Sequence, residues 1–201
     1  MKKLVVLFAA MIAMSGVAVA EGPVWTYVDL GFTVGDSNDE EFTDGDTDGI
    51  SLDGMWGKGL WHVGGSYGQI GFQDLDADVY KIMVGINPEI TDNIDMYVDL
   101  FMHNWDDSDN NFEADRTGLA WGVRAMVTDN FELNGGMSYV DFDVDGDESV
   151  TDVGFNFGLQ YFVNDSFGLG FTFDRFDFVD TDDYGTVDTA RIYARYNFGR
   201  K

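Results

Sequence analysis

The residues with the clearest spacing for chemistry are five aspartates grouped around a glycine. Asp141, Asp143, Asp145 and Asp147 alternate with other residues, and Asp152 occupies the twelfth place of the same stretch. Oxygen ligands at places 1, 3, 5 and 12, with glycine at place 6, follow the spacing of a calcium-binding loop, because glycine permits the turn that brings the ligands together. The stretch therefore predicts a site for Ca²⁺ or another divalent cation.

A second acidic stretch, residues 44–49, begins in the same way but lacks the final ligand. Met55 stands where the last carboxylate should be. Aspartate and glycine are also the ordinary residues of hydrated turns and loops. A loop without a metal therefore remains the alternative for both stretches.

Acid–base catalysis has little support in this chain. Histidine occurs only twice, as His62 and His103, with Asp99 and Asp106 near the second in the sequence. That neighbourhood is loosely similar to the His and Asp pairs of ten-stranded surface proteases, but those enzymes are much longer and none of their motifs is present. No Ser-His-acid spacing, zinc motif or phosphate-binding loop occurs. We therefore expect no enzymatic activity.

The other charged residues alternate with apolar ones in short segments. In the segment 190–198, Ala190, Ile192 and Ala194 alternate with Arg191 and Arg195. Side chains of a strand point to its two faces in turn, so one face is apolar and the other charged. Lipid outside and a closed, charged interior suit such a sheet. We expect the interior charges to form ion pairs; they are Asp29, Asp53, Lys81, Asp95, Asp99, Arg124, Glu132, Arg191 and Arg195.

Ten segments of this kind are expected as strands, each about as long as a tilted membrane-crossing strand. They lie near 24–34, 49–57, 59–69, 78–87, 94–104, 116–127, 132–142, 150–163, 167–176 and 187–198. Short turns rich in Asn, Asp and Gly alternate with longer acidic connections around 35–48, 70–77, 105–115, 143–149 and 177–186. The pattern predicts an all-β, closed, antiparallel up-and-down barrel of ten strands, with eight as the alternative. Both termini are expected at the end with the short turns.

Two details of the alternation add to this prediction. The first strand is expected to present Val24 outward together with Val28 and Leu30. In the ninth strand, Phe171 and Phe173 are odd-numbered while Phe176 and Phe178 are even-numbered, and a β-bulge near Asp174 and Arg175 would produce such a change of phase.

The chain begins with the pattern of a secretory signal peptide. Lys2 and Lys3 precede an apolar run that ends in Ala18-Val19-Ala20, so residues 1–20 are expected to be removed and residues 21–201 to form the barrel domain. With 37 acidic and 11 basic residues, the chain is a poor partner for nucleic acid. A secreted β-sandwich or lipocalin-type barrel would also alternate, but the acids concentrate in alternate connections rather than along one face of every strand.

These segments resemble the small outer-membrane β-barrel proteins of Gram-negative bacteria, related to the transmembrane domain of outer-membrane protein A. The resemblance covers the chain from Trp25-Thr26-Tyr27-Val28-Asp29-Leu30-Gly31 to Tyr193-Ala194-Arg195-Tyr196-Asn197-Phe198, and the phrase Thr91-Asp92-Asn93-Ile94-Asp95-Met96-Tyr97-Val98 is similar to the family's turn-and-strand pattern. Members usually end in an aromatic residue, whereas Phe198 is followed here by Gly199-Arg200-Lys201. The better-known small members have eight strands rather than ten.

The resemblance implies an integral outer-membrane protein inserted by the barrel-assembly machinery through its C-terminal strand. We expect contact with membrane lipid and lipopolysaccharide, no cofactor apart from divalent cations at the acidic loops, and a monomer. The favoured role is non-enzymatic, with acidic extracellular loops serving envelope integrity or surface contacts. A narrow cation-preferring, porin-like channel is the alternative, and an outer-membrane protease or lipid hydrolase is less favoured.

Overall fold

The computed structural model describes residues 22–37, 45–72, 75–107, 112–144, 150–178 and 186–198, and strands dominate all six ranges. The strands are β1 (Tyr27–Ser37), β2 (Gly45–Lys58), β3 (Trp61–Phe72), β4 (Leu75–Ile86), β5 (Glu89–Thr91), β6 (Ile94–Asp107), β7 (Phe112–Thr128), β8 (Phe131–Val144), β9 (Val150–Phe162), β10 (Phe167–Phe178) and β11 (Thr186–Asn197). Within the described residues, no helix has the length and apolar composition needed to cross a membrane.

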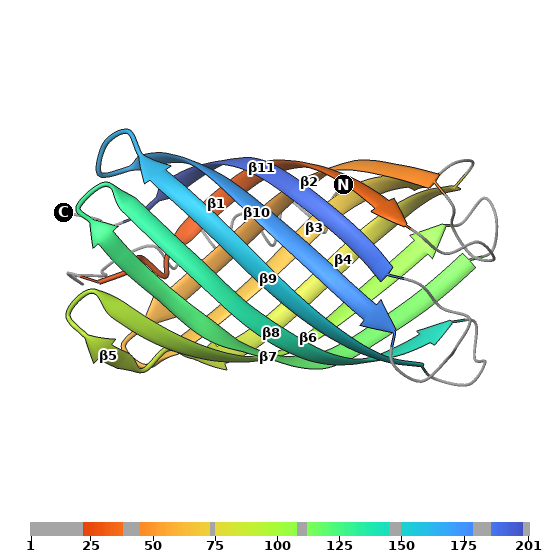
Figure 1. Ribbon diagram of the computed structural model, residues 1–201, viewed down its shortest axis with the longest axis horizontal. Helices are drawn as coiled ribbons and strands as arrows, with labels where there is room; N and C mark the ends of the chain where they lie inside the picture. The colour runs from red at the N-terminus through yellow and green to blue at the C-terminus, as the bar shows by residue number, and fades with distance from the viewer. Residues whose placement is uncertain are drawn as a thin grey trace.

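Ten of these strands form a closed ring (Figure 1). Each pairs antiparallel with its neighbours in the sequence, β1 pairs with β11, and β4 pairs with β6. β5 is a three-residue strand that pairs only with the start of β6. The predicted ten-stranded antiparallel barrel is therefore confirmed.

The barrel has two unlike ends. At the turn end, where β1 begins and β11 ends, the connections 59–60, 87–93, 129–130 and 163–166 are short, as predicted. Gly59 begins the tightest turn with a φ of 59°, a conformation that favours glycine. At the opposite end, called the loop end below, the strands run further than the sequence indicated. β3 and β4, for example, occupy residues 61–72 and 75–86, across most of the connection expected at 70–77.

The outer face of the wall is apolar. Leu30 and Leu100 are 63% and 62% exposed, an orientation that water would penalise and lipid favours. Further large apolar side chains are exposed on nearly every strand, including Phe32, Ile50, Trp61, Ile82, Val84, Met102, Trp121, Tyr139, Phe155, Phe157, Tyr161, Leu169, Ile192 and Tyr196. The alternation of apolar and polar residues along each strand predicts this arrangement, with apolar residues outside and charged residues inside.

The predicted bulge in β10 is absent. Pairing with β9 and with β11 continues without a shift through Asp174, Arg175 and Phe176. Phe176 instead keeps the strand's phase and points inward, where the Arg116 guanidinium lies 4.6 Å from its ring centroid. The apparent change of phase is thus an aromatic side chain that packs against a cation inside the barrel.

Candidate functional site: the charged lumen

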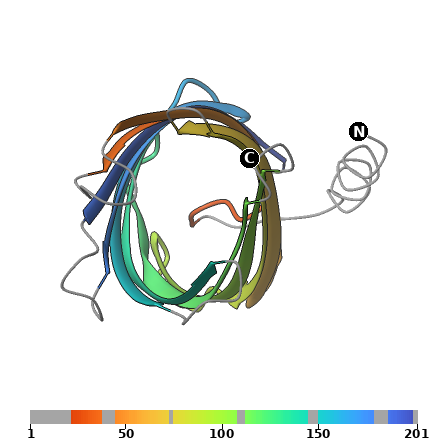
Figure 2. The same ribbon diagram turned by 90° about the vertical axis from the view of Figure 1, so that its right-hand side faces the viewer.

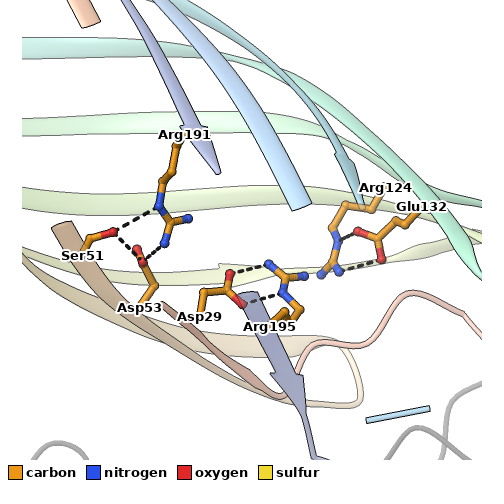
Figure 3. Close-up of polar contacts among 7 residues, drawn as sticks. All are labelled: Asp29, Ser51, Asp53, Arg124, Glu132, Arg191 and Arg195. Carbon is orange, nitrogen blue, oxygen red and sulfur yellow. Dashed lines mark hydrogen bonds and ion pairs between the residues drawn. The ribbon is translucent and has the colours of Figure 1, made fainter. Parts of the chain in front are cut away.

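The seam where the barrel closes carries a buried ion pair. Asp29 of β1 and Arg195 of β11 stand opposite each other, and Arg195 donates two hydrogen bonds of 2.7 Å to the Asp29 carboxylate (Figure 3). The Arg195 guanidinium also lies 3.4 Å from the centroid of the Tyr27 ring. Two bonds and a cation–π contact compensate both charges for the loss of water.

A second two-bond pair lies on the other side of the turn end. Arg124 of β7 donates hydrogen bonds of 2.8 and 3.0 Å to the Glu132 carboxylate of β8. Both side chains are buried. Each of the two pairs is neutral in itself, and both lie inside the turn end.

Two further pairs reach over a glycine on the strand between the partners. His62 of β3, Gly85 of β4 and Asp99 of β6 share a row, and His62 Nε2 lies 2.5 Å from Asp99 Oδ1. Arg191 of β11 likewise extends over Gly31 of β1 and binds Asp53 on β2. A Cβ on either glycine would collide with the charged group that passes above it.

Large aromatic residues lie along the wall in the same manner. Tyr97 of β6 shares a row with Gly122 of β7, Gly136 of β8 and Asn156 of β9, and it hydrogen-bonds Asn156 beyond both glycines. Tyr193 of β11 covers Gly170 of β10 in the same way. The glycines allow long side chains to lie against the wall instead of projecting across the lumen.

Of the nine charged residues named from the sequence, six pair with one another in the structure. Asp29 pairs with Arg195, Arg124 with Glu132, and Arg191 with Asp53. Asp99 pairs with His62, and Asp95 accepts a hydrogen bond from Trp25. The Lys81 ammonium lies 4.8 Å from the centroid of the Phe101 ring and is attracted by Asp174, Asp53 and Asp99.

The structure adds a pair that the sequence reasoning missed. Arg116 of β7 binds Asp152 of β9, crossing Val140 of β8. The alternation contained the signal, because Arg116 has the same parity as Arg124 within one strand. Asp152 is therefore a buried lumen residue, which contradicts its assignment as a calcium ligand.

The remaining predicted calcium ligands do not join Asp152. Asp141 and Asp143 are exposed side chains of β8, while Val140, which pairs with Asp152, is fully buried. Asp145 and Asp147 lie outside the described residues. In the described ranges, no three His, Cys, Asp or Glu side chains are grouped so as to hold a metal ion. Divalent cation binding at the acidic loops stays a prediction.

The two histidines are in different surroundings. His62 is buried between Asp99 and Asn87, with 3.1 Å from its Nδ1 to the Asn87 Oδ1. His103 instead receives a long hydrogen bond of 3.5 Å from the Trp105 indole. Asp99 thus pairs with His62 rather than with His103, so the arrangement that was compared with surface proteases does not form.

The start of the described chain is inside the barrel, which the sequence reasoning also missed. Pro23, Val24, Trp25 and Thr26 are buried, and Figure 2 shows this segment, in orange-red, within the ring of strands. Val24 therefore does not face lipid, contrary to the prediction. Pro23 was the available signal, because proline cannot donate to a strand ladder.

Trp25 is the centre of this N-terminal segment. Its indole Nε1 donates a 2.6 Å hydrogen bond to Asp95 Oδ2 of β6. Its ring stacks on His62 of β3 at 4.5 Å, and the Arg124 guanidinium lies 4.4 Å from the ring centroid. Three strands of the turn end therefore bind one side chain.

No protein-family model and no curated protein matches this sequence. Solved structures do match the fold. The COG4313 outer membrane channel from Pseudomonas putida F1 gives a TM-score of 0.55 at 10% identity, covering 88% of this chain and 96% of that one. Ail, the attachment invasion locus protein of Yersinia pestis, gives a TM-score of 0.43 at 15% sequence identity. The match covers 86% of this chain and 97% of the Ail chain. OmpT of Vibrio cholerae gives a TM-score of 0.40 at 15% sequence identity. The match covers 75% of this chain but only 56% of the OmpT chain.

The full antiparallel closure of this chain agrees with the Pseudomonas putida match. The chain has the fold of an outer-membrane β-barrel, and its apolar outer face is the one that lipid favours.

Proposed function

We propose that this protein is a non-enzymatic outer-membrane barrel whose lumen is closed to ions at rest and which serves envelope integrity or surface contacts. The observation that carries the proposal is the state of the lumen. Most of its charges form ion pairs along the wall, and the N-terminal segment lies inside the turn end, which we take to face the periplasm. Paired charges hold the wall together and offer few free groups to a passing ion.

The acidic loops would then face the outside. Short turns at the periplasmic end and longer loops outside are usual in such barrels. The whole chain has a net charge of −26 and its longer connections are acidic, so loops next to the phosphates of lipopolysaccharide would need divalent cations between them. Membrane lipid, lipopolysaccharide and the barrel-assembly machinery are the partners we propose, with the barrel as a monomer.

The test is the conductance of the refolded barrel in a planar lipid bilayer. We expect no steady current steps in neutral salt. A matched detergent preparation without protein sets the background. Steady cation-selective steps from the unaltered chain would contradict the closed lumen and favour the second candidate.

That second candidate is a narrow cation-preferring channel. Halfway along the lumen, the side chain of Asp53 is 32% exposed and that of Arg191 is 17% exposed, so the interior is not filled there. The Pseudomonas putida match with the TM-score of 0.55 is itself described as a channel. Its fold supports the candidate only as far as a shared architecture does.

A further inference from the structure

We propose that the barrel is a latent channel, closed by its own N-terminal segment, with Trp25 as the residue that blocks the turn-end mouth. The proposal rests on the proposed function in one respect, the closed resting lumen, and it adds which residues close it. The segment concerned is residues 22–26, immediately before β1.

The first argument is position. The N-terminal segment leads into β1, whereas the hydrogen-bond acceptor for Trp25 is Asp95 on β6 and its cation is Arg124 on β7. In the ring, β1 is separated from β6 by β2, β3 and β4, and from β7 by β11, β10, β9 and β8. β1 and the β6–β7 pair therefore stand on opposite sides, and Trp25 must reach across the mouth to contact them.

The second argument is the burial of the lumen side chains at the turn end. At the turn end, the side chains of Asp29 and Arg195 are 3% and 7% exposed, and that of Glu132 is 0% exposed. Halfway along, the Asp53 and Arg191 pair keeps the larger exposure given above. The long side chains there lie against the wall over glycines. The Arg116 and Asp152 side chains nearer the loop end are again buried, at 11% and 0% exposed, so the middle of the lumen is the more open part and the N-terminal segment lies at its turn-end side.

The third argument is how the segment is attached. Residues 23–26 belong to no strand, and the backbone of the segment is tied to the end of β11 by the 2.9 Å hydrogen bond from the Phe198 N–H to the Thr26 carbonyl. Trp25 supplies one hydrogen bond, one stacked ring and one cation–π contact. Thr26 exchanges two hydrogen bonds with the Gly57 backbone, at 3.2 and 3.3 Å. Such a segment is able to leave the mouth without unpairing the barrel.

Gly57 provides an independent way to displace it. A Cβ at Gly57 would overlap Trp25 Cβ and come within 3.0 Å of the Trp25 carbonyl oxygen. Backbone atoms cannot move aside as a flexible side chain can, so Gly57→Ala should push Trp25 out of place. Gly135→Ala is the matched control, since the nearest atom to its Cβ is Asn156 O at an ordinary 3.5 Å.

The test measures the current carried by folded barrels in planar bilayers. We expect the unaltered chain to give only the protein-free background current, and Trp25→Ala to give a time-averaged current at least about ten times that background, because it removes all three contacts of the indole. Trp61→Ala is the control for losing an indole, since Trp61 is exposed on the lipid side. Gly57→Ala should behave like Trp25→Ala, and Gly135→Ala like the unaltered chain.

Folding is checked first for every variant by the slower gel migration on heating that marks a folded barrel. If Trp25→Ala does not fold, Gly57→Ala, which keeps every side-chain contact group, decides the result. If neither the folded test variants nor the unaltered chain carry current, the proposal that Trp25 blocks the mouth is wrong, while the proposed closed barrel is unaffected. If the unaltered chain gives current steps as large as those of the test variants, both the closed lumen and the role of Trp25 are wrong. Steps from Trp61→Ala or Gly135→Ala equal to those of the test variants overturn the assignment to Trp25.

Discussion

Single arginines hold this lumen together by acting on two neighbours at once. Arg195 neutralises Asp29 and covers the Tyr27 ring, and Arg124 neutralises Glu132 while it lies over the Trp25 ring. Buried charge is costly unless it is paired and hydrogen-bonded. The loss of one partner should therefore cost more than the pair contributes.

Arg195→Ala should destabilise the barrel by about 3–5 kcal/mol, because the Asp29 carboxylate would be buried without a partner. The measurement is the urea midpoint of unfolding in lipid vesicles. Arg175→Ala is the control, since the Arg175 and Asp177 side chains are 40% and 53% exposed and such pairs contribute little. Equal midpoints for Arg195→Ala and the unaltered chain would contradict the paired lumen.

At this scale the sequence predicts which charges face inward but not which of them pair. Asp29 and Arg195 are recognisable because each is the polar member of an alternating segment. Their pairing depends on how far each strand slides against the next, and that register is not encoded within either segment alone. Trp25 was missed because Val24, Thr26 and Val28 continue the alternation, although the chain has already left the wall.

The strands of this barrel are matched by rows of residues that run around the wall. One such row crosses four strands and consists of Tyr97, Gly122, Gly136 and Asn156. Its two glycines leave room on the wall for the tyrosine ring. Because the ring covers the glycine backbone, the row fixes the register of three consecutive pairings.

Gly136→Ala should lower stability by about 1–3 kcal/mol, since the added methyl group would overlap the Tyr97 hydroxyl and approach the Trp121 carbonyl oxygen at 2.6 Å. Equilibrium unfolding in urea measures the change. The adjacent Gly135→Ala, with its open surroundings, should differ from the unaltered chain by less than about 0.5 kcal/mol. Similar losses for both would show that the tyrosine row is not a constraint.

The number and order of strands were predictable because every segment keeps the period of two over most of its length. The strand ends at the loop end were not. Aspartate and glycine near Asp48, Gly71 and Asp76 look like loop residues, yet their backbones still pair with neighbouring strands. Tertiary pairing overrides local preference there.

Seen as a whole, the molecule is an inverted globular protein, with its charges inside and its apolar side chains outside. Lipid replaces the hydrophobic core as the partner of those side chains, and backbone closure satisfies every strand edge of the ring. The position of a residue along the barrel axis therefore sets the consequence of placing a charge on the outer face.

Leu100→Arg should destabilise the inserted barrel by about 2–4 kcal/mol, because Leu100 lies in the middle of β6 on the lipid side. Ile90→Arg is matched in exposure, at 55% against 62%, but lies in the turn-end strand β5, where the cost should be about 0–1 kcal/mol. Unfolding from lipid vesicles measures both. Equal costs at the two depths would contradict this placement in the membrane.

The pairing of β1 with β11 continues one step beyond both strands, where the Phe198 N–H donates to the Thr26 carbonyl at 2.9 Å. The residue that follows β11 is thus bound to the residue directly after Trp25. When β11 meets β1 and completes the ring, it also encloses the segment that β1 carries. If the N-terminal segment is the plug proposed above, closing the wall and sealing the mouth share this contact.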